Sequence, residues 1–346
     1  IWVTNGVYTL TNSPAYISTD LLITSVNGRD SVIINGDGQW RCFELRHPAC
    51  VLDSLTISNG YTTNGGGGIV LRNGMVTNCL ITHCANEVGT DLSTGGGIRI
   101  AGGESNVLAN SVIRRNRNWS GGAGGLYVVH ATTSAIHHCI FEENMARSGA
   151  GMSVGYTLPL AATIRNCLFA RNATTNAGGY GGGIYLGNQC ARVLIANCTV
   201  VSNYAYEGGG GISFQGNYDL TNTVINCLVV SNLDRSAGGR TCNLRFVSGT
   251  ATFSNAVAYS CSWPSNDVFR VNDGRGNTTN PVQFLAFSEQ DYRCDSQSAC
   301  VNAGTNEAWM ADAVDLQGRR RIDPFSRRVD IGGYEYLPKG NLLQMR

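Results

Sequence analysis

The heptapeptide NCLFARN, residues 166–172, recurs along the chain in close variants. NCTVVSN begins at residue 197 and NCLVVSN at residue 226, while NCLITHC, NSVIRRN and HCIFEEN begin at residues 78, 110 and 138. Successive copies therefore start 32, 28, 28, 31 and 29 residues apart. Self-similarity at such a period indicates a repeat architecture, in which each repeat is one structural unit that stacks on the next.

A glycine cluster precedes a short apolar segment in each repeat. These segments read GIVL, GIRI, GLYV, GMSV, GIYL and GISF, and they begin at residues 68, 97, 125, 151, 183 and 211. Strands this short, with glycine and polar turns between them, are typical of a β-solenoid, whereas a helical repeat needs stretches of about 10–12 residues with a period of 3.6. The sequence predicts an all-β fold, a right-handed parallel β-helix with one coil per repeat.

Stacking of the coils would place equivalent residues in columns, since neighbouring strands lie about 4.8 Å apart. An asparagine in such a column can donate to one rung and accept from the other, which satisfies its buried amide. The asparagine column comprises Asn116, Asn144, Asn172, Asn203 and Asn232. We expect it to end at Cys84 on one side and at Cys261 on the other.

Two further columns follow from the same alignment. A column of buried, unpaired thiols is predicted at Cys79, Cys139, Cys167, Cys198 and Cys227, with Ser111 interrupting it. An apolar column is predicted at Ile81, Ile113, Phe141, Phe169, Val200 and Val229. Two other cysteine pairs, Cys42 with Cys50 and Cys294 with Cys300, lie outside these columns, and their spacing leaves disulfide or free thiol open.

Composition excludes several function classes. The net charge is +1, so no general field attracts nucleic acid or an anionic membrane. No run of about 18 apolar residues predicts a transmembrane helix. The only lysine is Lys339, so the glycine-rich corners lack the lysine of a phosphate-binding loop. No paired Cys or Cys/His spacing predicts a metal site, and we expect no cofactor.

The phrases FEEN or FARN combined with GGGI resemble the repeats of bacterial polymorphic outer membrane proteins over residues 64–245. Three later phrases, which begin at residues 280 (NPVQFLAFSEQDYRCDSQSACVNAG), 315 (DLQGRRRIDP) and 329 (VDIGGYEY), resemble the closing segment of bacterial β-helix proteins of the choice-of-anchor Q type. Cys294 and Cys300 stand where that family usually has Leu and Pro, which favours a disulfide between them. The resemblance implies an exported or surface-displayed bacterial protein but no particular activity.

The repeats and the resemblance together predict the organisation of the chain. We expect a parallel β-helix over residues 1–262, a capping segment over 263–336 and a tail over 337–346. The opening IWVTNGVYTL begins abruptly, so we expect a chain trimmed at its start, and we expect the anchor that would follow the tail LPKGNLLQMR to be absent or removed.

One outward column of the solenoid carries chemistry. It is predicted to contain Val70, Arg99, Tyr127, Ser153, Tyr185 and Ser213, with His130 three residues beyond Tyr127. In a polysaccharide lyase, Arg99 would neutralise a uronate carboxylate, His130 would remove the α proton and Tyr127 would protonate the leaving oxygen. The simpler alternative is that these side chains decorate a solvated wall.

A second charged cluster is predicted to be structural. Its members are Arg114, Arg115, Glu142, Glu143 and Arg171. Opposite charges alternate between neighbouring rungs, as they do in cross-strand ion pairs. A glycosidase with Glu142 and Glu143 as its carboxylate pair is disfavoured, because adjacent strand residues point to opposite faces.

Two hypotheses for the function remain. The first is an extracellular or cell-surface protein whose long wall serves polysaccharide binding, adhesion or assembly, with self-association left open. The second is a secreted polysaccharide-degrading enzyme, a lyase in preference to a glycoside hydrolase. Aromatic residues predicted to stack on sugar rings are Trp119, Tyr180, Tyr185, Tyr204 and Tyr206.

Overall fold

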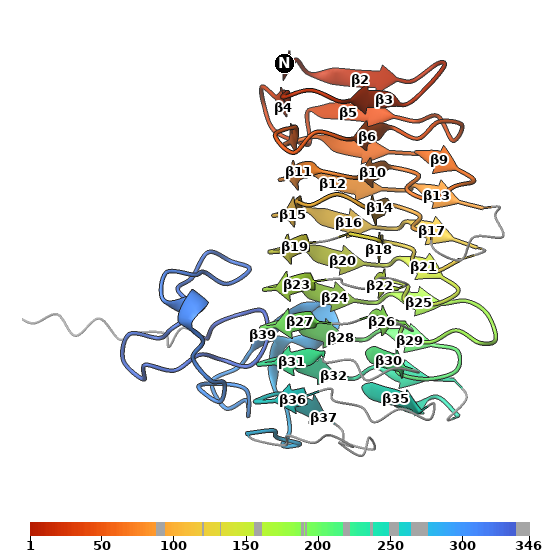
Figure 1. The fold of residues 1–346 in the computed structure, drawn as a ribbon. Helices are drawn as coiled ribbons and strands as arrows, with labels where there is room; N and C mark the ends of the chain where they lie inside the picture. The colour runs from red at the N-terminus through yellow and green to blue at the C-terminus, as the bar shows by residue number, and fades with distance from the viewer. Residues whose placement is uncertain are drawn as a thin grey trace, which may run out of the picture.

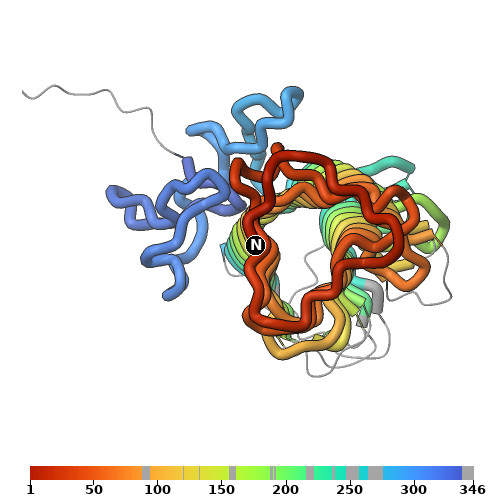
Figure 2. Tube along the Cα trace, turned by 90° about the horizontal axis from the view of Figure 1, so that it is seen from above, coloured from red at the N-terminus to blue at the C-terminus, as the bar shows by residue number. Residues whose placement is uncertain are grey.

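A computed structural model shows the chain wound into a parallel β-solenoid (Figure 1). It describes residues 1–87, 94–119, 121–131, 133–155, 161–187, 190, 192–216, 222–235, 238–248, 256–263 and 276–336. A complete coil passes in turn through four sheets, here named C, A, B and D. Seen from above, the coils superimpose around a common axis, and the C-terminal segment lies beside them (Figure 2).

The four sheets contain the following strands. Sheet A contains β1 (Trp2–Val3), β4 (Leu22–Ser25), β7 (Val51–Asp53), β11 (Gly74–Thr77), β15 (Asn106–Ala109), β19 (Thr133–His137), β23 (Ala161–Arg165), β27 (Val193–Ala196), β31 (Thr223–Ile225) and β36 (Ala256–Ala258). Sheet B contains β2 (Gly6–Thr9), β5 (Val32–Asn35), β8 (Thr56–Ser58), β12 (Leu80–Thr82), β16 (Val112–Arg114), β20 (Ile140–Glu142), β24 (Leu168–Ala170), β28 (Thr199–Val201), β32 (Leu228–Val230) and β37 (Cys261–Trp263). Sheet C contains β3 (Ala15–Ile17), β6 (Phe43–Leu45), β10 (Ile69–Leu71), β14 (Ile98–Ala101), β18 (Leu126–Val129), β22 (Met152–Val154), β26 (Ile184–Leu186), β30 (Ile212–Gly216) and β35 (Leu244–Ser248). Sheet D contains β9 (Tyr61–Thr62), β13 (Ala85–Asn86), β17 (Arg117–Asn118), β21 (Met145–Ala146), β25 (Ala173–Thr174), β29 (Tyr204–Ala205), β33 (Leu233–Asp234) and β34 (Arg240–Thr241).

The asparagine ladder is present as predicted between sheets B and D. From Asn116 to Asn232 each side-chain Nδ2 donates to the Oδ1 of the next asparagine at 2.9–3.1 Å. At its first end the backbone N of Cys84 donates to the Oδ1 of Asn116. The prediction of Cys261 at the other end is wrong, because Asn232 donates to Asn243 at 3.1 Å. The antiparallel pairing of β33 with β34 returns the chain after eleven residues, before a full coil is complete.

The other two columns are also confirmed. The apolar residues from Ile81 to Val229 pair directly across the strands of sheet B. The column cysteines are buried and free, and the backbone N of Cys79 donates to Ser111 Oγ, so the serine occupies the thiol position in its coil. Buried free thiols pack as small apolar groups.

The predicted disulfide between Cys294 and Cys300 is wrong: both residues are free thiols. They are buried together with Cys261 in the apolar cluster between the C-terminal segment and sheet B, where they pack as small hydrophobic side chains. Cys42 and Cys50 are free as well. The Cys42 thiol donates to the carbonyl of Ile34, and the Cys50 thiol donates to the carbonyl of Asn73.

The C-terminal segment, residues 276–336 of the described chain, contains β38 (Phe284–Ala286), η1 (Phe287–Glu289), β39 (Asp291–Cys294) and η2 (Ala308–Met310). Thr278 forms a parallel bridge with Cys261 of β37, on the side of that strand opposite to β32. The rest packs against the side of the solenoid where sheets A and B meet (Figures 1 and 2). Asn226 Nδ2 donates to Thr305 O, for example, and Gly333 N donates to Thr199 Oγ1. The segment therefore covers a side of the coils, while residues 264–275 and the tail 337–346 lie outside the described residues.

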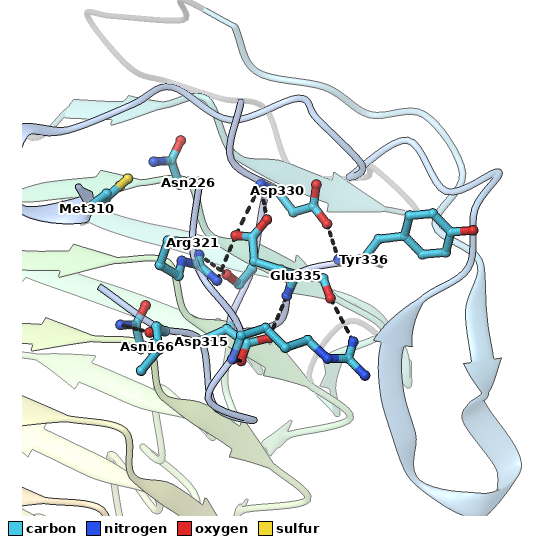
Figure 3. A network of polar contacts seen from close by, with 12 residues as sticks. Asn166, Asn226, Met310, Asp315, Arg321, Asp330, Glu335 and Tyr336 are labelled. Carbon is cyan, nitrogen blue, oxygen red and sulfur yellow. Dashed lines mark hydrogen bonds and ion pairs between the residues drawn. The ribbon is translucent and has the colours of Figure 1, made fainter. Parts of the chain in front are cut away.

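A buried polar network lies inside this segment (Figure 3). Arg321 is completely buried, and its guanidinium pairs with Glu335 at 3.0 Å and donates to the carbonyl of Gly332 at 2.7 Å. Asp315 accepts from the backbone N of Glu335, and Asp330 accepts from the backbone N of Tyr336. One buried cation thus lies among three carboxylates that also bind backbone amides.

Candidate functional site

The predicted outward column runs along sheet C. Register pairs Val70 with Arg99, Arg99 with Tyr127, Tyr127 with Ser153 and Ser153 with Tyr185. The column continues to Ser213 and Arg245 at one end and to Glu44 and Tyr16 at the other. The observed register therefore confirms the column that was predicted from the alignment of the repeats.

Outward in this column does not mean exposed. Tyr127 is only 4% exposed, and it packs with Ala101, Ala123 and Val129 in a small apolar cluster separate from the main core of the solenoid. The corner loops between sheets D and C fold over the strands. Gly149, at φ +56, lies so close that a Cβ there would come within 3.0 Å of the Tyr185 Cβ. Glycine is required at this corner for both its conformation and its size.

A cleft of about 290 Å³ opens between the strands of sheet C and these loops, and we name it the sheet C cleft. It is lined by Gly121, Gly122, Tyr127, Arg147, Ser148, Ser153, Gly178, Tyr180, Tyr185 and Gln215. The strands β18, β22, β26 and β30 supply the floor, and the loops after β21 and β25 supply Arg147 and Tyr180. Residues from five successive coils thus form one depression.

The chemistry of the sheet C cleft is aromatic and polar. The Tyr185 hydroxyl donates to Gln215 Oε1. Tyr180 donates to Glu207 at 3.3 Å, and the guanidinium of Arg245 lies 5.2 Å from its ring centre. Arg147 is exposed, and within the described residues its guanidinium has no hydrogen bond or ion pair. The cleft therefore offers two positioned phenol rings and a cation available to a ligand.

The three residues assigned to lyase chemistry occupy different surroundings. Arg99 donates to the carbonyl of Asn64 at 3.0 Å, toward the corner between sheets D and C. Tyr127 is buried at the floor of the cleft, while His130 is exposed at the turn that follows β18. His130 does not line the cleft. Their joint role in catalysis stays a prediction.

The five predicted sugar-stacking aromatics divide between two faces. Tyr180 and Tyr185 line the sheet C cleft. Trp119 and Tyr206 lie at the ends of sheet D strands, where Arg117 and Arg235 stack on their rings at 5.9 and 4.5 Å. Tyr204 lines a separate cavity between sheets B and D.

Sequence reasoning missed a column of left-handed residues beside the asparagine ladder. Between sheets B and D every coil has one residue in the left-handed conformation, directly before the ladder position in most coils. These residues are Asn59, His83, Arg115, Glu143, Arg171, Ser202 and Ser231, with φ of 51–56°. Their side chains line the outside of the bend. The signal was available, because the residue preceding each ladder asparagine can be read as a column of its own.

The first coils of this column border a cavity of about 550 Å³, here named the His83 cavity. It is lined by Asp37, Gly38, Asn59, Gly60, Tyr61, His83, Ala85, Glu87, Arg115 and Arg117. Burial and the nearby Arg115, Arg114 and Arg117 lower the pKa of His83. Its Nδ1 lies 2.9 Å from Thr82 Oγ1, which orients the ring. A neutral imidazole among guanidinium groups can accept a proton from an anionic ligand.

The charged cluster further along the same column is structural, as predicted. Glu143 pairs with Arg115 at 2.7 Å and with Arg171 at 3.2 Å, and these partners lower the pKa of Glu143. Glu142 pairs with Arg171 at 2.8 Å and with Arg114 at 3.9 Å. Arg171 also donates to the Tyr292 hydroxyl at 3.0 Å, so this cluster helps to attach the C-terminal segment.

Two features are absent from the part of the chain that the structure describes. No helix there is long and apolar enough to cross a membrane. The same residues contain no group of three or more His, Cys, Asp or Glu side chains placed to hold a metal ion.

Solved structures resemble the chain at the level of its fold. The pectate lyase Pel9A matches with a TM-score of 0.57 and 14% identity, over 97% of this chain and 87% of that protein. A variant of the PL6 family alginate lyase AlyGC matches at a TM-score of 0.27 and 11% identity, over 98% of this chain and 56% of that protein. No curated protein sequence matches the chain. The model of the right-handed beta helix region matches residues 5–199, more than half of the sequence, and the chain therefore belongs to that family.

Proposed function

We propose that the protein binds an acidic polysaccharide in the sheet C cleft. The observation that carries this proposal is the juxtaposition of Tyr180 and Tyr185 with an exposed Arg147, whose guanidinium has no partner among the residues that the structure describes. Phenol rings offer apolar faces to sugar rings, and a guanidinium binds a uronate carboxylate through two parallel hydrogen bonds. The cleft spans several coils, which suits consecutive residues of an extended chain.

The cellular setting is part of the same proposal. A polysaccharide ligand of this kind is met outside the cell, so we propose that the protein is exported or displayed on a bacterial surface. The tail phrases that resemble choice-of-anchor Q proteins support this setting, and so does the fold shared with a pectate lyase. Adhesion or assembly would follow from binding the polymer at a surface.

The binding proposal predicts a charge-selective effect of Arg147→Ala. We expect this variant to weaken binding of oligogalacturonate by about tenfold or more, because a charge-assisted pair contributes roughly 1.5–3 kcal/mol. Tyr185→Ala should weaken it as well, while Trp119→Ala, on the sheet D side, serves as the control. Calorimetric titration measures all three. Equal affinity of Arg147→Ala and wild type for the acidic oligomer would refute the cleft as the site.

A second candidate function is a uronate lyase, and the His83 cavity favours it. Neutral His83 would take the α proton of a uronate bound in this cavity, whose wall includes Arg115 and Arg117, paired with Glu143 at 2.7 Å and with Glu87 at 2.9 Å. The electron pair of that C–H bond would form the new carbon–carbon double bond, and the β C–O bond would break. The departing sugar oxygen would take its proton from water, so charges and atoms balance without a cofactor.

The lyase candidate predicts that His83→Ala abolishes release of unsaturated product from polygalacturonate. The sensitive measurement is ultraviolet absorbance of the new double bond, with His130→Ala as the matched histidine control. Because the pKa of His83 is lowered, its base form persists at more acidic pH than that of an ordinary histidine, and the acidic limb of the rate profile should move accordingly. Loss of product in His130→Ala alone would instead support the sheet C residues as the catalytic group, and no product from wild type would exclude the lyase.

A further inference from the structure

A third cavity, of about 510 Å³, lies between sheets B and D at the last coils of the solenoid. We name it the Trp263 groove. Its described lining residues are Ser202, Asn203, Tyr204, Ser231, Leu233, Thr241, Trp263 and Phe287. It is several coils away from the His83 cavity, and it shares no lining residue with the sheet C cleft.

The Trp263 groove is built from two parts of the chain. The last coils supply Tyr204 from β29, Leu233 from β33 and Trp263 from the end of β37, whereas Phe287 comes from η1 of the C-terminal segment. Phe287 packs edge-to-face on Tyr292, with ring centres 5.8 Å apart. The Tyr292 hydroxyl is in turn held by Arg171 at 3.0 Å. Docking of the C-terminal segment on the solenoid therefore positions Phe287, which completes the lining of the groove.

The lining combines aromatic rings with hydroxyl groups. Tyr204, Trp263 and Phe287 present ring surface, and the side chain of Phe287 is 44% exposed. Ser202, Ser231 and Thr241 add hydroxyl groups, which have no hydrogen-bond partner within the described residues. Exposed ring surface favours contact with an apolar face of a ligand, and the neighbouring hydroxyl groups, which water can satisfy in the free protein, can donate to and accept from that ligand.

The charge of the groove selects the class of ligand. None of the described lining residues is charged, so a carboxylate or phosphate would lose its hydration without gaining a cation. The side-chain amide of Asn203 is already used in the ladder, and the backbone N of Ser231 donates to Trp263 O, so neither is left to pair with a peptide strand. The aromatic rings and hydroxyl groups of the groove suit an uncharged ligand that has apolar faces and hydroxyl groups along its edges.

We propose that the Trp263 groove is a second saccharide site, which takes an uncharged sugar of an oligo- or polysaccharide. The sugar ring stacks on Trp263 and Tyr204, and its hydroxyls bond to Ser202, Ser231 and Thr241. The proposal does not depend on the sheet C cleft, since the two sites differ in both residues and charge. Two sites on one rigid scaffold would bind a long or mixed polymer with higher avidity than either alone.

The test is titration of the full chain with four uncharged oligomers, namely cellohexaose, maltohexaose, mannohexaose and xylohexaose, and with oligogalacturonate. We expect at least one uncharged oligomer to bind wild type and to lose tenfold or more in affinity with Tyr204→Ala or Phe287→Ala. Both variants should bind oligogalacturonate as wild type does. Tyr185→Ala is the matched control, since it replaces a tyrosine of the other cleft and should leave the uncharged oligomer unaffected.

A spectroscopic readout separates ligand contact from a structural effect. Binding of the uncharged oligomer should change tryptophan fluorescence, and that change should disappear in Trp263→Phe, which keeps an aromatic ring in the apolar cluster. Failure of all four uncharged oligomers to bind wild type overturns the proposal. So does unchanged affinity in both Tyr204→Ala and Phe287→Ala, whatever the outcome for the acidic oligomer at the sheet C cleft.

Discussion

Replacing Asn172 with leucine is expected to lower the free energy of unfolding by roughly 3–5 kcal/mol. The Asn172 Nδ2 donates to Phe141 O and to Asn203 Oδ1, both at 2.9 Å, while its Oδ1 accepts from the backbone N and the side-chain Nδ2 of Asn144. Leucine removes all four bonds within a completely buried site. Several polar groups then lack a partner, and each such group costs about 1–3 kcal/mol.

Urea unfolding of Asn172→Leu against wild type measures this effect. Asn176→Leu is the control. It is the same asparagine-to-leucine substitution, but Asn176 is exposed in the corner loop after β25 and lies outside the ladder. The damage should begin at the broken rung, since each coil contacts only its neighbours. A loss below about 1 kcal/mol in Asn172→Leu would contradict the contribution assigned to the ladder.

The ladder could be predicted because its spacing is strictly tied to the coil. Every coil from Asn116 to Asn232 returns the same residue to the same bend, so alignment of the repeats alone gives the contacts. The last member, Asn243, breaks that rule. The hairpin of β33 and β34 brings Asn243 to the next ladder position before the following coil (β35, β36 and β37) begins, and this antiparallel pairing is encoded by no repeat period.

The candidate sites were less predictable because they depend on loops. The rungs of Tyr127 and Tyr185 were correctly aligned, but alignment says nothing of corner loops that bury one ring and leave the other half-exposed. Arg147 belongs to such a loop and has no equivalent in the repeat pattern. Phe287 reaches its groove only through the docked C-terminal segment, about 24 residues beyond the last strand of sheet B. These are long-range contacts between irregular segments.

Replacing Arg321 with methionine is expected to destabilise the C-terminal segment and to weaken its docking on the solenoid. Arg321 is the buried cation that faces Glu335, Asp315 and Asp330 (Figure 3). Removal of one partner from a buried ion pair costs about 3–5 kcal/mol, because the buried groups that faced the guanidinium lose both its charge and its hydrogen bonds. Limited proteolysis should then cut within residues 276–336 while the coils persist. Glu335→Gln keeps the shape and should be milder.

The same network gives docking of the segment a dependence on pH. Burial raises the pKa of Glu335 from its ordinary value of 4.5 to about 8, and it raises the pKa of Asp330 as well. The folded state therefore holds these protons more tightly than the unfolded chain does. Their contribution to stability is complete below about pH 4.5 and falls as the pH rises toward 8.

The pH dependence also supplies the decisive comparison for this network. Glu335→Gln carries no titratable proton, so the midpoint of segment release should vary less between pH 5 and 8 than it does in wild type. Arg321→Met should vary more steeply, because loss of the cation raises the pKa of Glu335 further. Limited proteolysis or thermal unfolding of wild type and the two variants between pH 5 and 8 measures how steeply segment release depends on pH in each. If Glu335→Gln retained the full wild-type slope, another group would have to hold the proton, and the pH dependence would not arise at Glu335.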